Sequence, residues 1–152
     1  MIKTLNHTDH HIAYEIQQVF QVSYAVEAQL LNADNFPPLQ RKLNEFTNCN
    51  NIFYGYYVNE TLAAVTEIKH NNTTTHIQSL VVRPDFFRKG IAQKLIDFTL
   101  KTHNSPLITV ETGADNLPAS QLYVKMGFTE TRKWMTEHDI VKVGFEKRQQ
   151  HK

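Results

Sequence analysis

The stretch Ser79–Ala92 places the end of a strand, a turn and the start of a helix in direct succession. Ile77–Val82 is a β-branched apolar run of strand length, and Pro84, which cannot donate into a sheet, predicts that the strand ends just before it. After Gly90, apolar residues return with helical spacing and predict one buried helix face. A helix therefore opens directly off a strand end, and we expect the rest of the chain to be organised around this junction.

The start of this helix is a candidate anion site. The first amides of a helix have no internal acceptor, and the helix dipole adds partial positive charge there. Gly90 allows the backbone to approach a ligand closely, and Arg88 and Lys89 add full charges. Phosphate or pyrophosphate is the expected ligand at this helix start. The alternative is an ordinary strand-to-helix connection with a solvated Arg-Lys pair.

The six residues Phe87–Ala92 resemble the cofactor signature of the GNAT acetyltransferases, which reads Gln or Arg, two residues, Gly, one residue, then Gly or Ala. Phe87 departs from this signature, but the departure removes one polar side chain and none of the backbone amides. Residues that resemble the second cofactor segment, Asn-x-x-Ala-x-x-x-Tyr and then Gly-Phe, are Asn116, Ala119, Tyr123, Gly127 and Phe128. The resemblance covers residues 50 to 130 well and the N-terminal part only in its order of elements.

The resemblance implies an α+β fold with a mixed, mostly antiparallel central sheet flanked by helices, in the order β-α-α-β-β-β-α-β-α-β-β. It also implies acetyl-CoA as the acetyl donor and no metal. The backbone of β-strand residues 80–82 would pair with the pantetheine amides, while the amides of residues 88–93 would hold the pyrophosphate. The expected cofactor contacts are Leu80, Val81, Val82, Arg88, Lys89, Gly90, Ile91, Ala92, Gln93, Asn116 and Tyr123.

The remaining pattern predicts the other elements. Expected strands span 2–5, 52–58, 62–69, 76–82, 107–111, 128–136 and 140–147. A first helix capped by Thr8 or Asp9 should be interrupted near Ser23, and further helices are expected over 39–46, over 90–103 and from a cap at Asp115 or Asn116 to Gly127. The strand at 107–111 should return parallel to the strand at 76–82.

The composition predicts one globular domain, residues 1–152, with 41% hydrophobic and 20% charged residues. A formal net charge of +1 argues against a nucleic-acid binder that depends on a strongly basic surface. The N-terminus lacks the apolar core of a signal peptide, and no stretch is apolar enough to span a membrane. We therefore expect a cytoplasmic monomer or homodimer without a nucleic-acid or membrane partner.

The cysteine and the N-terminal histidines do not predict a reactive site. Cys49 cannot form an internal disulfide, and no histidine nearby in sequence suggests activation of its thiol. His7, His10 and His11 could share a helix face and hold a metal, but no carboxylate or thiolate set completes such a site. Solvated histidines at a helix start are the favoured interpretation.

Acyl transfer to an amine needs an acid for the departing thiolate and an amine that is neutral or becomes so. The resemblance assigns the acid to Tyr123, whose phenol, with an unperturbed pKa of about 10, is protonated at neutral pH. A buried tyrosine on an apolar helix face is the alternative. His76, Glu67 and Glu111 are rival candidates for the base. A water relay or an already neutral amine would need no side-chain base.

The leading hypothesis is an acetyl-CoA-dependent N-acetyltransferase that acts on a primary amine by direct transfer in a ternary complex. The alternative is a CoA-binding sensor or interaction module without turnover, which Phe87 favours slightly and Tyr123 argues against. In the family, the connection between the first two helices forms one wall of the acceptor pocket. By that analogy, candidate acceptor contacts are Tyr24, Glu27, Asp34 and Phe36. The sequence does not identify the acceptor: an acid-lined pocket would suggest a polyamine or aminoglycoside, and an open groove a peptide amine.

Overall fold

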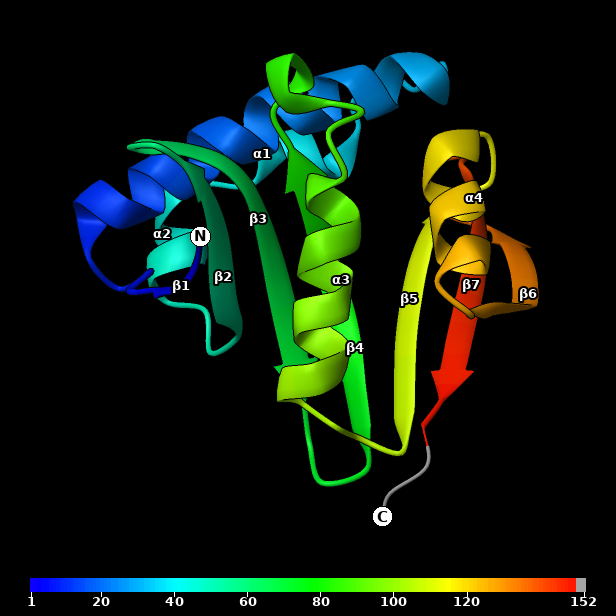
Figure 1. Ribbon diagram of the computed structural model, residues 1–152. Helices are drawn as coiled ribbons and strands as arrows, with labels where there is room; N and C mark the ends of the chain where they lie inside the picture. The colour runs from blue at the N-terminus through cyan, green and yellow to red at the C-terminus, as the bar shows by residue number, and fades with distance from the viewer. Residues whose placement is uncertain (150–152) are drawn as a thin grey trace.

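A computed structural model describes residues 1–149, which form one sheet of seven strands in the order β1-β2-β3-β4-β5-β7-β6 (Figure 1). The elements are β1 Ile2–Leu5, α1 His10–Leu30, η1 Pro37–Gln40, α2 Leu43–Thr47, β2 Ile52–Val58, β3 Thr61–His70, β4 Thr74–Val82, η2 Pro84–Phe86, α3 Ile91–Thr102, β5 Leu107–Gly113, α4 Leu117–Lys125, β6 Thr129–Met135 and β7 Val141–Arg148. The single domain expected over 1–152 extends beyond the described residues by 150–152 and stays a prediction.

The predicted α+β class and the order of strands and α-helices are confirmed. Strands β4 and β5 pair in parallel, whereas the other neighbouring strands of the sheet pair antiparallel. The caps also form as predicted: the Asp9 side chain accepts from the amide of Ile12, and the Asn116 side chain accepts from the amide of Ala119. The last strand, β7, inserts between β5 and β6, a position that the sequence pattern does not specify.

Two predicted elements differ from the structure. The interruption expected near Ser23 is wrong, because α1 is continuous and the Ser23 Oγ accepts a hydrogen bond of 3.3 Å from the Val82 amide of β4. The helix expected over 39–46 is divided into η1 and α2. Arg41 and Lys42 between them have extended backbone angles, so the two turns cannot join into one helix.

The helices form two layers, one on each face of the sheet. Core side chains of α1 and α2, among them Phe20 and Phe46, pack on Val65 of β3. On the other face α3 and α4 pack over the centre and the β5–β7 side, where Ile96 and Tyr123 join one apolar cluster. Figure 1 shows α3 and α4 together in front of the sheet. The C-terminal end of α1 and the N-terminal end of α4 therefore both lie near the C-terminal ends of β4 and β5.

Strands β4 and β5 pair over only part of their length. The parallel register ends at Ile77 and Val110, although β4 continues to Val82 and β5 to Gly113. Gln78 is an extra residue on β4 at this point, where the register between β3 and β4 shifts. Such a bulge bends the strand that carries it. Beyond it the two strands diverge (Figure 1), and the β4 edge that faces β5 is left without a strand partner among the described residues.

Candidate active site

Two cavities lie along the divergence of β4 and β5, and they share a wall. One, of about 620 Å³, extends between α1, η1, β4, β5 and the turn that joins β6 to β7; we call it the β5 cavity. The other, of about 550 Å³, extends between α1, the end of β4, η2 and the starts of α3 and α4; we call it the α3 cavity. The residues that line both are Tyr24, Glu27, Leu80, Asn116, Ala119 and Tyr123. The structure therefore contains two adjoining compartments rather than one pocket.

The residues predicted to hold the cofactor gather around the α3 cavity. All of them line it except Lys89, whose Nζ instead lies 5.3 Å from the centre of the Phe86 ring. Phe87, the departure from the family signature, also lines this cavity and is exposed. The strand end, the turn and the helix start that the sequence singled out thus contribute to one wall of a single compartment.

The backbone at the start of α3 is shaped for an anion. Gly90 caps the helix with φ of 76°, in the left-handed region that favours glycine, and no atom lies within 4 Å of the position that a Cβ would take. The carbonyl of Gly90 accepts from the Lys94 amide at 3.1 Å, which fixes the first turn. The preceding amides have no acceptor within the helix, so their partial positive charge is available to a ligand in the α3 cavity.

Tyr123 and Asn116 stand in the shared wall. The Tyr123 ring is 5% exposed and packs against Phe128 and Phe145. Burial, together with the nearby Glu27 carboxylate, raises the pKa of the Tyr123 phenol above its ordinary value, so it is protonated at neutral pH. Asn116 caps α4 through its Oδ1, and its Nδ2 donates to the Glu27 Oε1 at 2.8 Å.

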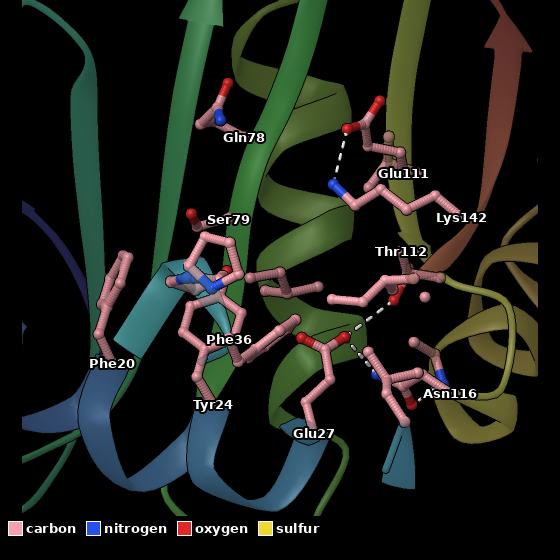
Figure 2. Close-up of a pocket in the computed structure, with 18 of the residues that line it drawn as sticks. Phe20, Tyr24, Glu27, Phe36, Gln78, Ser79, Glu111, Thr112, Asn116 and Lys142 are labelled. Atoms are coloured by element: carbon pink, nitrogen blue, oxygen red, sulfur yellow. Dashed lines mark hydrogen bonds and ion pairs between the residues drawn. The ribbon is translucent and has the colours of Figure 1, made fainter. Parts of the chain in front are cut away.

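Two of the three candidate bases line the β5 cavity. The His76 Nδ1 lies 2.8 Å from the Thr109 Oγ1 on the neighbouring strand. Burial, with the positive charge of Lys142 nearby, lowers the pKa of His76 below its ordinary value although Glu111 opposes this, so the imidazole is neutral at pH 7. Glu111 accepts from the Lys142 Nζ at 2.9 Å (Figure 2). His76 is therefore able to accept a proton, while Glu111 is already compensated by a cation.

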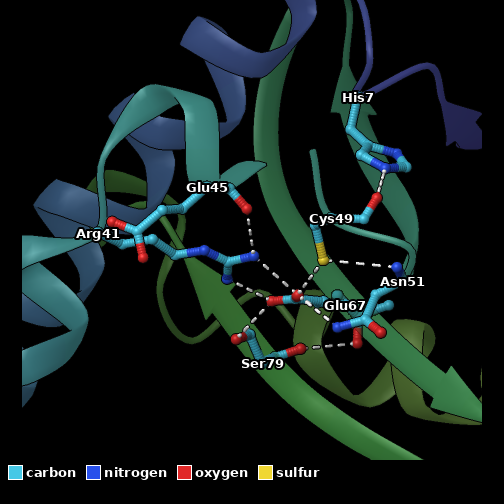
Figure 3. Close-up of polar contacts among 8 residues, drawn as sticks. His7, Arg41, Glu45, Cys49, Asn51, Glu67 and Ser79 are labelled. Atoms are coloured by element: carbon cyan, nitrogen blue, oxygen red, sulfur yellow. Dashed lines mark hydrogen bonds and ion pairs between the residues drawn. The ribbon is translucent and has the colours of Figure 1, made fainter. Parts of the chain in front are cut away.

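The third candidate, Glu67, lies outside both cavity linings. Its side chain is 1% exposed, and its oxygens accept from Arg41 at 2.7 and 3.0 Å, from Asn51 at 2.8 Å and from Ser79 at 3.1 Å (Figure 3). Burial alone would raise the pKa of Glu67, but these hydrogen bonds outweigh it and lower the pKa. Arg41 and Ser79 do line the β5 cavity, so this geometry favours a role for Glu67 in holding that wall.

One face of α1 supplies the other side of the β5 cavity. Phe20, Tyr24, Glu27 and Leu31 follow one another at intervals of four, three and four residues, which places them on one helix face. Leu31 approaches the end of β5 so closely that a Cβ on Gly113 would lie 2.4 Å from its side chain. The glycine thus permits the end of α1 to close over the end of β5.

Glu27 connects α1 to the opposite wall. Its Oε1 accepts from the Thr112 Oγ1 at 3.1 Å and from the Asn116 Nδ2 at 2.8 Å, as Figure 2 shows. Sequence reasoning named Glu27 only by analogy and missed Thr112, Arg41 and Ser79 entirely. The signal that could have identified Glu27 from the sequence is a carboxylate within an apolar stripe of helical spacing. Asp34, also expected near the acceptor, is exposed and lines neither cavity.

The N-terminal histidines do not converge. His7 Nε2 lies 2.6 Å from the Cys49 carbonyl oxygen, and His11 pairs with Glu15 at 3.1 Å. Within residues 1–149 no group of three or more His, Cys, Asp or Glu side chains is placed to hold a metal. Burial raises the pKa of the Cys49 thiol. In the same part of the chain, no helix has both the length and the apolar character needed to cross a membrane.

The sequence matches the family model described as "Acetyltransferase (GNAT) family" over residues 13–128. It is 37% identical over 130 residues to the UPF0157 protein YqkA of Bacillus subtilis (strain 168); the match covers 84% of this chain but only 38% of that protein. It is 28% identical over 133 residues to a streptothricin acetyltransferase of Escherichia coli, covering 84% of this chain and 75% of that one.

Among solved structures, the ribosomal-protein-S18-alanine N-acetyltransferase from Escherichia coli superposes with a TM-score of 0.76 at 16% sequence identity. The match covers 96% of this chain and 91% of that one. At this level of identity the likeness establishes the fold. It agrees with the seven-stranded sheet and the two helical layers described above.

Proposed function

Because this chain belongs to the GNAT acetyltransferase family, we propose that it transfers an acetyl group directly from acetyl-CoA to a primary amine, with both substrates bound at once. Acetyl-CoA is the acetyl donor in this family. The observation that carries the proposal is the wall shared by the α3 and β5 cavities. Direct transfer needs donor and acceptor sites that open onto each other, so that the amine reaches the thioester carbon without a covalent enzyme intermediate.

The α3 cavity would take the donor. The unpartnered edge of β4, from Gln78 to Val82, offers backbone groups to the pantetheine amides, as an added strand would. The Val82 amide on this edge donates at present to the side chain of Ser23, a weak bond of 3.3 Å that a ligand carbonyl could replace. The amides of residues 88–93, with the Arg88 charge, would hold the pyrophosphate. This placement puts the thioester near Leu80 in the shared wall.

The β5 cavity would take the amine, with Tyr123 and His76 moving protons. The ammonium form of the amine first loses one proton to His76 through water, and the neutral nitrogen then attacks the thioester carbon. As the C–N bond forms and the C–S bond breaks, the electron pair left on sulfur takes the Tyr123 proton. The nitrogen, which now carries one proton too many, gives that proton to the Tyr123 phenolate, so Tyr123 ends the cycle neutral. The products are the amide, CoA thiol and one proton released to solvent.

Streptothricin is the first acceptor to test, because a relative aligned over 84% of this chain is named streptothricin acetyltransferase. Thiol release from acetyl-CoA should be followed with a thiol reagent, using streptothricin, spermidine, kanamycin and peptides with a free N-terminus or lysine. We expect thiol release with at least one amine, and initial-rate lines that intersect when both substrates are varied. Acetyl-CoA binding without thiol release on any amine would instead support a CoA-binding module and refute the proposal.

A further inference from the structure

Glu27 stands in the wall shared by the two cavities, and we propose that its carboxylate binds the reactive ammonium group of the acceptor. We further infer that this group is carried on an apolar aminoalkyl arm, which packs along the aromatic side chains that lead to Glu27. The inference rests on the proposed function and names the class of acceptor for the same site. Its basis is the charge, the position and the surroundings of one carboxylate.

Within residues 1–149, no cation compensates the negative charge of Glu27. Its two hydrogen bonds come from neutral donors, Thr112 and Asn116, and both end on Oε1, which leaves Oε2 available (Figure 2). Among the ion pairs formed by residues 1–149, none includes Glu27. Of the other carboxylates that line the β5 cavity, Glu111 is paired with the Lys142 Nζ, whereas Glu45 is exposed, accepts from the Lys42 amide and does not line the shared wall. A partly buried, uncompensated carboxylate is the group that gains most from a cationic ligand.

The position of Glu27 is where the reacting nitrogen must arrive. Glu27, Leu80 and Tyr123 all line both cavities, so a cation held by the carboxylate would lie beside the thioester in the proposed donor site. The Glu27 charge is also close enough to the Tyr123 phenol to contribute to the raised pKa of that group. Thr112 and Asn116 hold the carboxylate from the β5 and α4 sides, which limits its rotamers before the ligand binds.

Three aromatic side chains that line the β5 cavity, Phe20, Tyr24 and Phe36, form what we call the aromatic track, which leads to this carboxylate. The Phe20 and Tyr24 rings are 5.7 Å apart and the Tyr24 and Phe36 rings 5.9 Å apart, both edge to face. Tyr24 precedes Glu27 by three residues, so the Tyr24 ring and the Glu27 carboxylate lie on the same face of α1. Methylene groups pack well on such rings, and an ammonium is attracted to their faces. The combination favours a primary amine at the end of an unbranched carbon arm.

The test of the ammonium site is Glu27→Gln, which keeps the shape and an oxygen acceptor for Thr112 and Asn116 but removes the charge. With streptothricin as acceptor, we expect KM for the amine to rise about 10- to 100-fold, the range of a hydrogen bond to a charged group, with a smaller change in kcat. The acetyl-CoA Kd from calorimetry should stay within about twofold. Glu27→Asp keeps the charge and should recover part of the loss.

The matched control is Glu15→Gln, which removes the same charge from the same helix at a residue that lines neither cavity. It should leave the kinetic constants unchanged. If the wild-type protein acetylates amines while Glu27→Gln retains its KM, or if Glu27→Asp is as impaired as Glu27→Gln, the ammonium site is wrong and the proposed function survives. A wild-type protein that acetylates no amine overturns the proposed function itself.

The arm is tested with two simple acceptors, n-pentylamine and L-alaninamide. We expect a kcat/KM at least about 10-fold higher for n-pentylamine, because its carbons can pack on the aromatic track while its nitrogen binds Glu27, whereas L-alaninamide has no such carbon arm. Tyr24→Ala should reduce this preference. Equal or better use of L-alaninamide would overturn the inferred class of acceptor.

Discussion

Replacing Arg41 with methionine should destabilise the protein by about 3 kcal/mol at pH 7, because it leaves a buried carboxylate without its cation. Arg41 donates to both oxygens of Glu67, at 2.7 and 3.0 Å, and its guanidinium lies 4.2 Å from the centre of the Phe46 ring. The Glu67 side chain is 1% exposed and that of Arg41 is 20% exposed. Methionine retains most of the apolar packing, so the loss reports mainly on the ion pair.

The magnitude follows from what remains around the carboxylate. Breaking a buried pair by removing one partner costs about 3 to 5 kcal/mol. Asn51 and Ser79 still donate to Glu67 in the variant, which places the expected cost at the lower end of that range. For a chain of this length such a loss lowers the Tm by about 6 to 12 °C. Glu67→Met combined with Arg41→Met should cost much less than the sum of the two single changes, because no charge is left unpaired.

The pH dependence provides a second signature. In the wild-type protein the pKa of Glu67 is lowered, so its contribution to stability is present above the unfolded pKa of about 4.5 and is lost as pH falls through the lowered folded value. In Arg41→Met, burial should raise the pKa of Glu67, and stability should then be lost as pH rises through that raised value. The free-energy difference between the two proteins should therefore be larger at pH 7.5 than at pH 4.5.

Urea unfolding at both pH values measures these differences. Lys101→Met is the matched control, since it breaks a pair with Asp97 whose side chains are 77% and 51% exposed and should cost about 0.5 kcal/mol or less. An Arg41→Met cost below about 1 kcal/mol, or one that does not change with pH, would refute the reasoning.

Three further changes test the proposed site. Tyr123→Phe should lower kcat about 10²-fold at unchanged acetyl-CoA affinity, as stopped-flow and calorimetry would show; an unchanged rate of the chemical step would leave the phenol a structural role. Gly90→Ala should weaken acetyl-CoA binding about 10-fold by calorimetry, because alanine is strained at φ of 76°, and an unchanged affinity in a folded variant would argue against the pyrophosphate site. The lowered pKa of His76 predicts that kcat/KM rises with pH through a value below 6.5; His76→Gln should abolish this acid limb, and its persistence would assign it to another group.

Much of the fold could be predicted from the sequence because the signals are local. The cap at Asp9 and the stop at Gly127 each depend on a few consecutive residues, and each lies where the sequence places it. The junction around Gly90 is also specified by local signals. Pro84 ends the strand before it, and the helical spacing of apolar residues specifies the helix after it. The expected helix over 39–46 failed because its pattern did not reveal that Arg41 would turn toward a buried partner.

The sequence predicted residues of the α3 cavity better than residues of the β5 cavity. One continuous stretch, residues 80–93, forms one wall of the α3 cavity, and most of its lining residues could be named in advance, whereas Ser23, Val26 and Leu30 of α1 were not. The β5 cavity joins segments that are distant in the chain: Glu27 meets Asn116 across 89 positions, and Glu67 meets Arg41 across 26. No local pattern specifies such pairs, and Glu67 therefore looked like a candidate base when only its position on a strand was known.

The sequence by itself determined most of the elements, their caps and the strand-to-helix junction at Gly90, because backbone propensity, capping and turn chemistry act between near neighbours. Only the tertiary structure decided where β4 and β5 part, that β7 lies against β5, and which α1 side chains face the opening. Ser23 in the continuous helix α1 illustrates why the tertiary structure was needed. The Ser23 hydroxyl could have broken the helix, but it accepts from the Val82 amide 59 positions away, a partner that exists only once the chain is packed.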